Sequence, residues 1–525
     1  MRDQKRYWAA AALLGLAGVA VRAWAIGSEP LWLDEAYSAY AADHDFTFLW
    51  HVVPRYETHP PFYYSLLHLW VGLFGNGLFA LRLPGLLAGF ATPPVAALAA
   101  SEVAAWLGWR DARRSRLCLV SFGLASLSMA LVEMSRQVRP YPIMVFVFAA
   151  AILVMLRLGR QRDEGRPLAL GEYATYLLLV EAMLWLHSLG PLFGLSLVIA
   201  FAVAMSRPFP TPGAWPWLIG GHALLALCYL PGLIILHDQA PTWVASTWLR
   251  FSLDRGFVDH IATLYAAPDL AGLGGVLLAG LALAALKRTR IGIRLAVILL
   301  TLALLPVILS VAISLTITPV FITRTMTPVV VPAILLLAIG AAAWDGKGRI
   351  LGLGGASMIG AALFTADLQA RLSGPTQNWY PALAWLAPKF QPGDQIFAYP
   401  NEGALPLHYA LRDKGLAYPI RAIPTAVPTF DVMGGRYPTG SRGVVSLPRA
   451  ELRAIAEEPA TRAVPTIWLL RLGAPTYDPG DAFLQELHRG RYVVRSWDDG
   501  PINIIGLRLL SKAPKSQPGP VRNRQ

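Results

Sequence analysis

Long apolar runs fill residues 7–368, and short polar stretches rich in arginine separate them. Most runs are about 18 to 25 residues long, which is the length that an α-helix needs to cross the core of a bilayer. Hydropathy predicts eleven such helices, at residues 7–26, 79–107, 116–135, 140–159, 171–189, 190–206, 214–236, 263–286, 295–317, 324–343 and 350–368. The pattern therefore predicts a polytopic α-helical membrane protein.

Segment 60–74 decides how these helices are oriented. It is apolar but short and rich in aromatic residues, so it is either a twelfth span or a helix in the membrane interface. If it does not cross, the basic loops at 110–116, 157–166, 287–294 and 347–349 share a side with the basic amino terminus, as the positive-inside rule requires. We therefore expect an interfacial helix, a cytoplasmic amino terminus, and residues 27–78 as one loop on the outer face.

From about residue 370 the pattern changes to frequent prolines and charges without a run of span length. Strands are predicted at 395–399, 466–471, 492–497 and 502–509, and helices at 382–390 and 481–488. We expect a membrane domain at 1–369, a soluble α/β domain at 370–511 on the outer, periplasmic or extracellular side, and a disordered tail at 512–525.

The composition supports a membrane protein and excludes some partners. Hydrophobic residues make up 55% of the chain and charged residues only 15%, which is less charge than soluble domains carry. The net charge of +13 is explained by the basic loops, and no basic stripe with interleaved aromatics indicates nucleic acid. Because Cys118 and Cys228 both lie in apolar spans, no disulfide framework is expected.

Asp34 and Glu35 follow the first apolar run and are the strongest catalytic candidates. Two adjacent carboxylates at a membrane boundary are costly to keep unless something uses them. A carboxylate near apolar surface can act as a general base toward an attacking hydroxyl or amine. The structural alternative is that Asp34 caps an interfacial helix beginning near Ala36, and both roles are compatible.

Two arginines in the short outer loop 135–141 point to an anionic partner. The positive-inside rule disfavours Arg136 and Arg139 there, and guanidinium groups bind phosphate in a bidentate way. The alternatives are pairing of Glu133 with Arg136 or Gln137 and snorkelling of Arg139. Arg324 at the outer end of the tenth helix is either a further phosphate ligand or an interface anchor.

His59 and His187 are weaker candidates, because a lone histidine at a helix end is more often a hydrogen-bonded structural group. No histidines or carboxylates show metal-ligand spacing, so a divalent cation is left open without support. There is also no glycine-rich phosphate loop, nucleotide fingerprint or hydrolase elbow. A base and arginines at the outer surface indicate group transfer from a lipid-linked phosphate donor.

Four stretches together resemble the bacterial GT-C glycosyltransferases of families 39 and 83, which include protein O-mannosyltransferases and the aminoarabinose transferase of lipid A. They are Trp32-Leu33-Asp34-Glu35-Ala36, His59-Pro60-Pro61-Phe62-Tyr63-Tyr64, Arg136-Gln137-Val138-Arg139-Pro140-Tyr141, and Arg324 before a proline-containing helix. The resemblance implies a GT-C fold of about eleven transmembrane helices plus interfacial helices. It also implies inverting transfer from a polyprenyl-phosphate sugar, in the bacterial inner membrane.

The same resemblance implies roles for individual residues. Asp34 would be the catalytic carboxylate, with Glu35 supporting it. The donor phosphate pocket would use His59, Arg136, Arg139, Tyr141 and Arg324, and the candidate substrate pocket adds Tyr37, Tyr63, Tyr64 and His187. Thr58 stands where the aminoarabinose branch has a glutamate, and Tyr37 where it has an arginine. A metal bridge through position 58 and aminoarabinose as the sugar are therefore not assigned.

Two other classes compete with a transferase. A transporter or lipid flippase would use intramembrane groups such as Glu181 and His222, although no internal repeat is visible. A non-catalytic envelope assembly protein would use Asp34 only as a cap. For the transferase the expected partners are a polyprenyl-phosphate sugar, membrane lipids, and an acceptor that is lipid A, another envelope glycan or a protein. The sugar, the polyprenol and the oligomeric state are open at this point.

Overall fold

The computed structural model divides the chain into two compact units. It describes residues 2–57, 59–206, 214–246, 249–265, 270–426, 447–474, 478 and 480–510. Of these, the first unit holds residues 2–29 and 37–375, and the second holds residues 30–36, 376–426 and 447–510. Thr58 and the predicted tail at 512–525 lie outside the described residues.

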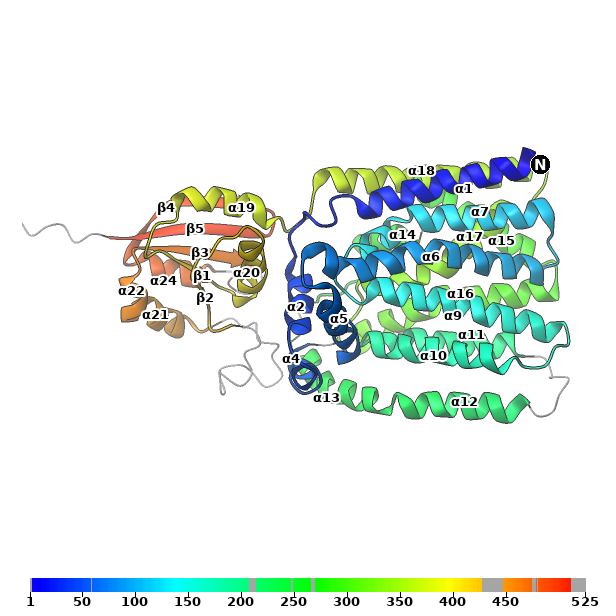
Figure 1. Ribbon diagram of the computed structural model, residues 1–525, viewed down its shortest axis with the longest axis horizontal. Coiled ribbons are helices and arrows are strands. Elements are labelled where there is room, and N and C mark those ends of the chain that lie inside the picture. The colour runs from blue at the N-terminus through cyan, green and yellow to red at the C-terminus, as the bar shows by residue number, and fades with distance from the viewer. Residues whose placement is uncertain are drawn as a thin grey trace, which may run out of the picture. The chain divides into compact units, whose positions relative to one another are not determined.

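The first unit is a bundle of helices that run side by side (Figure 1). The helices are α1 (Arg2–Ala23), α3 (Phe46–His51), α4 (Val53–Tyr56), α5 (Pro61–Phe74), α6 (Leu78–Trp106), α7 (Asp111–Leu127), α8 (Met129–Ser135), α9 (Tyr141–Asp163), α10 (Leu170–Leu186), α11 (Gly190–Ala204), α12 (Ala214–Cys228), α13 (Leu230–Ser246), α14 (Arg255–Tyr265), α15 (Leu270–Leu286), α16 (Arg290–Thr316), η1 (Thr323–Val329), α17 (Val330–Ala342) and α18 (Lys347–Ser373). Helix α2 (Leu33–Ala42) starts with residues of the second unit and ends with residues of the first. Among the described residues, the apolar runs of the sequence lie mainly in helices.

Five helices in the described part of the chain are long and apolar enough to cross a membrane, or up to seven if each bent pair is one span. The bundle is therefore that of a multi-pass membrane protein, and the larger number of eleven spans stays a prediction. The candidates are Leu78–Trp106, Tyr141–Asp163, Arg290–Thr316, Thr323–Ala342 and Lys347–Ser373.

Several predicted spans are not single regular helices, and the run 263–286 falls in both α14 and α15. The run 116–135 bends by 54° between α7 and α8, where Ser128 is extended. The run 214–236 bends by 43° between α12 and α13, next to Pro231, which lacks the N–H that a continuous helix needs. The tenth span starts as the 3₁₀ helix η1 and continues as α17, so hydropathy found these segments but not their breaks.

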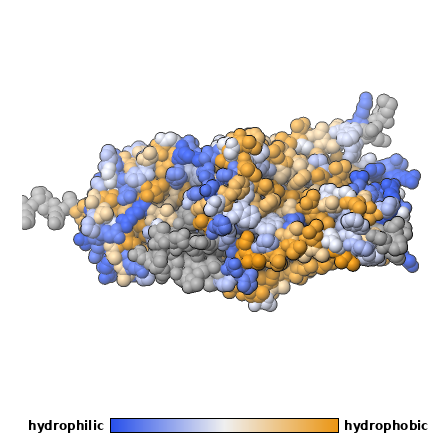
Figure 2. Space-filling model, turned by 60° about the horizontal axis from the view of Figure 1, so that its bottom comes forward, coloured by the Kyte–Doolittle hydropathy of each residue, from blue (hydrophilic) through white to orange (hydrophobic). Residues whose placement is uncertain are grey.

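Helix α17 lies at the centre of the bundle, since its residues Val330–Ala342 are all buried. Close packing there depends on a small residue: a Cβ added at Gly340 would collide with the Leu278 carbonyl of α15. Small residues let helix backbones approach closely where no side chain separates them. The outer surface of the bundle is largely hydrophobic, as expected for helices that face lipid (Figure 2).

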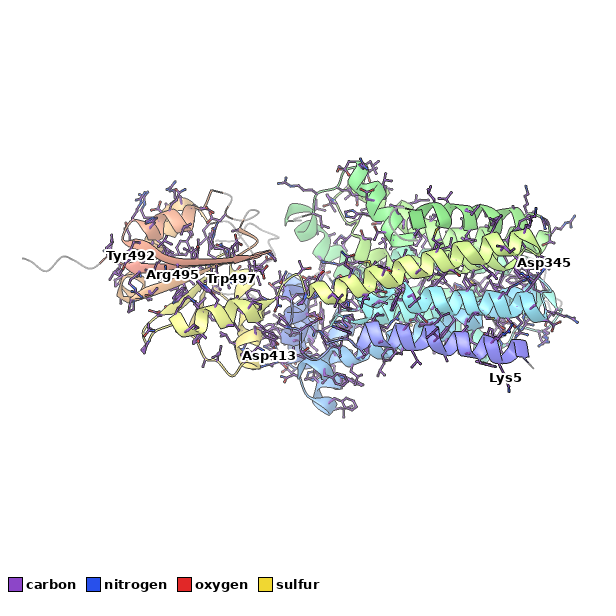
Figure 3. All side chains as sticks on the ribbon, turned by 90° about the horizontal axis from the view of Figure 1, so that it is seen from above. Lys5, Asp345, Asp413, Tyr492, Arg495 and Trp497 are labelled. Atoms are coloured by element: carbon purple, nitrogen blue, oxygen red, sulfur yellow. The ribbon has the colours of Figure 1, made fainter. Side chains whose placement is uncertain are left out.

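Charged loops gather at one end of the bundle. Arg113 and Arg116 of α7 both pair with Asp345, and the second ion pair measures 3.1 Å. Lys5 near the amino terminus lies at the same end as Asp345 (Figure 3). Helix α5 lies at the opposite end from the amino terminus (Figure 1). The predicted cytoplasmic loops around residues 113 and 345 are thus adjacent in space.

The second unit contains a five-stranded mixed sheet in the order β2-β1-β3-β5-β4. Strand β1 pairs in parallel with β2 and β3, whereas β5 pairs antiparallel with β3 and β4. The strands are β1 (Gln395–Ala398), β2 (Ile420–Ala422), β3 (Thr466–Leu472), β4 (Arg491–Asp499) and β5 (Ile502–Leu509). The helices are α19 (Trp379–Leu386), η2 (Ala387–Lys389), η3 (Asn401–Gly403), α20 (Ala404–Asp413), α21 (Arg449–Glu457), α22 (Pro459–Ala463) and α24 (Ala482–His488).

Helices cover both faces of this sheet. Successive side chains of a strand point to opposite faces, so each strand can contribute to two cores. Ile396 of β1 packs in a core with α19 and α20, and its neighbour Phe397 packs in a second core with α21 and α24. The first core also contacts Leu33, which explains why residues 30–36 belong to the second unit. The predicted strands are confirmed, and the sequence missed the short β2 around Arg421.

Candidate active site

The two acids stand in the first turn of α2, within the second unit. The Leu33 N–H donates to Gln377 Oε1 at 3.1 Å, and the Trp32 N–H donates to Glu35 Oε2 at 3.4 Å. Helix α2 therefore begins at Leu33, earlier than the predicted start near Ala36, and Asp34 is not the residue before it. The buried Glu35 satisfies an N–H of the preceding turn, as the glutamate of a capping box does, while Asp34 is half-buried.

Arg139 forms the centre of a buried polar group in the first unit. Its Nη2 donates to His59 Nε2 at 2.7 Å, its Nη1 donates to Ser38 Oγ at 3.4 Å, and its guanidinium lies 5.8 Å from the centre of the Tyr141 ring. Because a guanidinium can only donate, His59 Nε2 accepts, and this ring is neutral with its proton on Nδ1. The Glu57 carboxylate lies 3.9 Å from the same nitrogen.

His187 adds a second imidazole from the turn between α10 and α11. Its ring centre lies 4.1 Å from that of His59 and 5.6 Å from that of Tyr141. His187 Nδ1 accepts the Leu189 N–H at 2.9 Å, so the proton of the neutral ring is on Nε2.

The buried Nε2–H of His187 has no hydrogen-bond partner among the described residues. A buried donor without a partner is costly, and it is often explained by a ligand or an ion. We call Ser38, His59, Arg139, Tyr141 and His187 the Arg139 cluster, on which Arg324 acts through its charge. Guanidinium groups and an oriented N–H are donors of the kind that bind anions.

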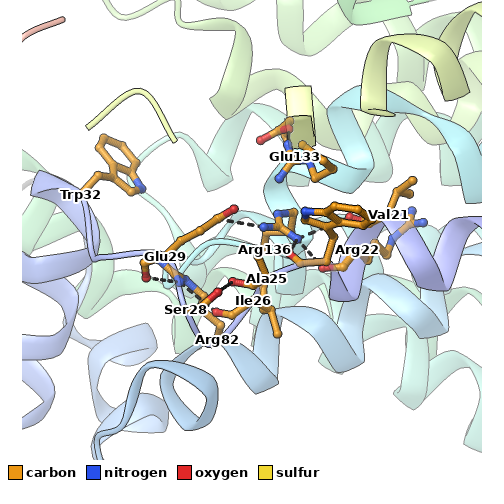
Figure 4. Close-up of polar contacts among 12 residues, drawn as sticks. Val21, Arg22, Ala25, Ile26, Ser28, Glu29, Trp32, Arg82, Glu133 and Arg136 are labelled. Atoms are coloured by element: carbon orange, nitrogen blue, oxygen red, sulfur yellow. Dashed lines mark hydrogen bonds and ion pairs between the residues drawn. The ribbon is translucent and has the colours of Figure 1, made fainter. Parts of the chain in front are cut away.

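Arg136 lies in a different group, which holds the chain as it leaves α1 (Figure 4). Its Nη1 donates to the carbonyls of Arg22 at 2.8 Å and Trp24 at 2.6 Å, and its Nη2 pairs with Glu29 at 2.9 Å. Arg82 of α6 donates to the carbonyls of Ile26 at 2.9 Å and Glu29 at 2.8 Å. These arginines satisfy carbonyls that the end of a helix leaves open.

The remaining candidates lie on α2, α5 and η1. Tyr63 and Tyr64 are buried in α5 with their rings edge to face at 5.4 Å, Tyr37 is half-buried in α2, and Arg324 is half-buried in η1. Glu133, whose alternative partners from the sequence were Arg136 and Gln137, forms an ion pair with Arg371 of α18. In the described part of the chain, no group of three or more histidines, cysteines or carboxylates is placed to hold a metal.

Sequence reasoning missed Ser38, Glu29 and Arg82. Ser38 follows Asp34 by four residues, and nothing in its type signals a contact with Arg139. Arg82 is close to the start of a long apolar run, and Glu29 is just beyond another, where single charges are common. Their partners are main-chain carbonyls or arginines distant in sequence, which hydropathy cannot identify.

No protein-family model and no curated protein matches the chain. Solved structures do match it. The apo structure of ArnT from Cupriavidus metallidurans gives a TM-score of 0.59 at 14% identity, over 94% of this chain and 97% of that one. The same protein bound to undecaprenyl phosphate gives 0.55 at 14% identity, over 95% and 97%.

A second kind of enzyme matches with the same fold. Archaeal oligosaccharyltransferase AglB from Archaeoglobus fulgidus, in complex with an inhibitory peptide and a dolichol-phosphate, gives a TM-score of 0.51 at 12% identity. The match spans 96% of this chain and 74% of that one. The chain has the GT-C fold of these glycosyltransferases, as the resemblance implied, and the number of spans stays a prediction.

Proposed function

We propose that this protein is a glycosyltransferase that moves a sugar from a polyprenyl-phosphate donor to an acceptor on the outer face of the membrane. The observation that carries the proposal is the buried Arg139 cluster, which includes the oriented Nε2–H of His187. Proteins of the same fold have been solved with undecaprenyl phosphate and with dolichol-phosphate. A cluster of buried donors suits the phosphate of such a lipid.

The proposed reaction is a direct displacement at the anomeric carbon. The acceptor nucleophile attacks C1 and loses its proton to Asp34, which acts as general base with support from Glu35. The bond from C1 to the phosphate oxygen breaks, polyprenyl phosphate leaves, and the anomeric configuration inverts. Arg139 and Arg324 stabilise the charge that grows on the phosphate, together with N–H donors from His187 and His59.

Arg136 shapes the donor site from a distance in this proposal. Its contacts with the carbonyls of Arg22 and Trp24 and with Glu29 hold the segment that leads from α1 into the first outer loop. Tyr141 supports Arg139 through its ring, and the aromatic rings of Tyr37, Tyr63 and Tyr64 are proposed to contact the sugar.

The proposed topology has eleven spans in the bacterial inner membrane, a cytoplasmic amino terminus, and the α/β unit on the periplasmic side. It is supported by the positive-inside rule and by the ion pairs of Arg113 and Arg116 with Asp345, which join two basic loops. The proposed acceptors are lipid A or another lipopolysaccharide component, a different envelope glycan, or a protein side chain.

A transfer assay tests this function. The full-length protein, purified into lipid nanodiscs, would be incubated with radiolabelled polyprenyl-phosphate sugars and a membrane extract. We expect label in a product other than the donor, with one polyprenyl phosphate released per sugar transferred. Donor flux across liposomes without any transfer would indicate a transporter, and neither activity with any donor would support an assembly role.

A further inference from the structure

A cavity with a charged rim lies in the bundle, far from the Arg139 cluster along α9. Its volume is about 320 Å³, and it opens between α6, α7, α9 and α10. The lining residues are Leu98, Ser101, Glu102, Arg114, Leu153, Val154, Arg157, Glu172 and Thr175. Arg157 is 16 residues beyond Tyr141 on α9, which corresponds to about 24 Å at the rise of an α-helix.

The lining is layered along the helices. On α6, Leu98 lies about one turn deeper in the bundle than Ser101 and Glu102, and on α9, Leu153 and Val154 precede Arg157. The charged residues are therefore nearer the loops, and the apolar residues are nearer the middle of the bundle. A lipid has the same order of polarity, with a charged headgroup above an acyl chain.

Two features of the charged layer point to a ligand that carries both a negative and a positive charge. Among the described residues, Arg114 contacts the Ser101 hydroxyl at 2.7 Å and 3.1 Å but no carboxylate. Glu172 Oε1 pairs with Arg157 at 3.0 Å, while its buried Oε2 has no hydrogen-bond partner in the described part of the chain. The cavity thus offers a guanidinium beside an acceptor oxygen.

The charged groups of the lining identify the class of headgroup. Two arginines and two glutamates line the cavity, and Glu102 pairs at 2.7 Å with Arg160 outside the lining, so a ligand meets two guanidinium groups and the acceptor oxygen of Glu172. We infer that this cavity binds a phospholipid with a primary ammonium headgroup, of the phosphatidylethanolamine type. The phosphate contacts Arg114 and Arg157, and the ammonium donates to Glu172 Oε2. This inference does not rest on the transferase function.

Native mass spectrometry of the delipidated full-length protein tests the inference. The probes are phosphatidylethanolamine, phosphatidylcholine and phosphatidylglycerol with identical acyl chains. We expect phosphatidylethanolamine to bind at least about tenfold tighter than phosphatidylcholine, whose quaternary ammonium has no N–H to donate. Equal or tighter binding of phosphatidylglycerol or phosphatidylcholine overturns the inference.

Two variants place the binding in this cavity. Glu172→Gln should abolish the preference for phosphatidylethanolamine over phosphatidylcholine, and Arg114→Gln should weaken both lipids. Arg114 is exposed, so its replacement keeps the test open if Glu172→Gln does not fold. The exposed controls Arg290→Gln and Glu457→Gln, which do not line the cavity, should bind as the natural protein does. Retention of the preference in Glu172→Gln, or unchanged affinity for both lipids in Arg114→Gln, contradicts the assignment.

Discussion

Arg139 and His187 are the residues at which burial and charge most clearly indicate a ligand. Arg139 is 4% exposed and His187 is 2% exposed, and both are polar groups held among rings rather than in solvent. A buried cation is costly unless hydrogen bonds and an opposite charge compensate it. A phosphate bound at the cluster would add acceptor oxygens and an opposite charge to these donors.

Replacing Arg139 tests this role. Arg139→Gln removes a charge-assisted hydrogen bond to phosphate, which is worth about 1.5 to 3 kcal/mol, so the Kd for undecaprenyl phosphate should rise by tenfold or more. Binding would be measured with the purified protein in nanodiscs, independently of turnover. The exposed Arg250→Gln is the matched control and should bind normally. Unchanged affinity in Arg139→Gln would remove Arg139 from the phosphate site.

The hydrogen bond that His187 Nδ1 accepts makes a prediction about pH. Protonation of Nδ1 would break its bond with the Leu189 N–H, so the ring should stay neutral, with its Nε2–H donating, through the usual histidine range near pH 6.5. His187→Phe removes that donor and should slow transfer by about tenfold or more. The rates of the two proteins would be compared between about pH 5.5 and 8. A ratio that changes strongly near pH 6.5 would show that His187 titrates there and contradict the neutral assignment.

At the scale of elements, the arginines at the end of α1 form a clamp on the first loop. Arg136 and Arg82 come from different parts of the chain and donate to four carbonyls between Arg22 and Glu29. Arg22 itself donates to the Ser126 and Ala125 carbonyls of α7 at 2.5 Å and 3.0 Å. The segment before the first loop is therefore held through its backbone.

The variant Arg136→Ala should distinguish a role of Arg136 in this clamp from a role in binding phosphate directly. We expect a lower thermal midpoint, because Glu29 loses its buried partner, and a lower kcat for transfer. The Kd for undecaprenyl phosphate should stay within about twofold of the natural value, since Arg136 contacts main-chain carbonyls and Glu29. A large loss of lipid-phosphate affinity with a normal thermal midpoint would assign Arg136 to the phosphate site.

Elements were predictable where their signal is local. Apolar runs located the helices of the bundle, and alternation located β1, β3, β4 and β5. The bend at Ser128 was not predictable, because Ser128 is a small polar residue like others inside helices. The partners of Arg136 were not predictable either, since carbonyls leave no trace in the side-chain pattern. The structure therefore places Arg136 in the clamp, whereas the candidates His59, Arg139, Tyr141 and His187 lie in the Arg139 cluster.

At the scale of the whole molecule, Asp34 and Glu35 show that hydropathy cannot assign a segment to its structural unit. Asp34 and Glu35 follow a membrane helix in sequence, yet the structure groups residues 30–36 with the α/β unit. Leu33 packs on the core of that unit, and Gln377 accepts its N–H. Such an association depends on contacts between residues far apart in the chain. The fold could be predicted from the sequence, but this association could not.

The stability of the α/β unit should depend on acid through Glu486. Its buried carboxylate accepts from Arg449 at 2.7 Å and Arg453 at 3.2 Å, and Arg489 lies 3.1 Å away. These guanidinium groups, Arg449 first, lower the pKa of Glu486 from its ordinary value of 4.5. A lowered folded pKa means that the stabilisation is present above pH 4.5 and is lost as the pH falls below it.

Thermal unfolding of the full chain between about pH 7 and 3.5 measures this effect. The midpoint of the transition assigned to the α/β unit should fall in acid, and Glu486→Gln should lower it at pH 7 and flatten its pH dependence. Glu457→Gln, which replaces an exposed glutamate of the same unit, is the control. An unchanged acid dependence in Glu486→Gln would exclude Glu486 as its source.

The most direct test of the account is sugar transfer by Asp34→Asn. The purified variant would be supplied with the labelled polyprenyl-phosphate sugar that the natural protein uses, beside Asp43→Asn as a control from the same loop. Loss of the general base should slow transfer at least about a hundredfold, with undecaprenyl phosphate binding retained and Asp43→Asn active. Transfer by Asp34→Asn at a rate near that of the natural protein would contradict the proposed mechanism.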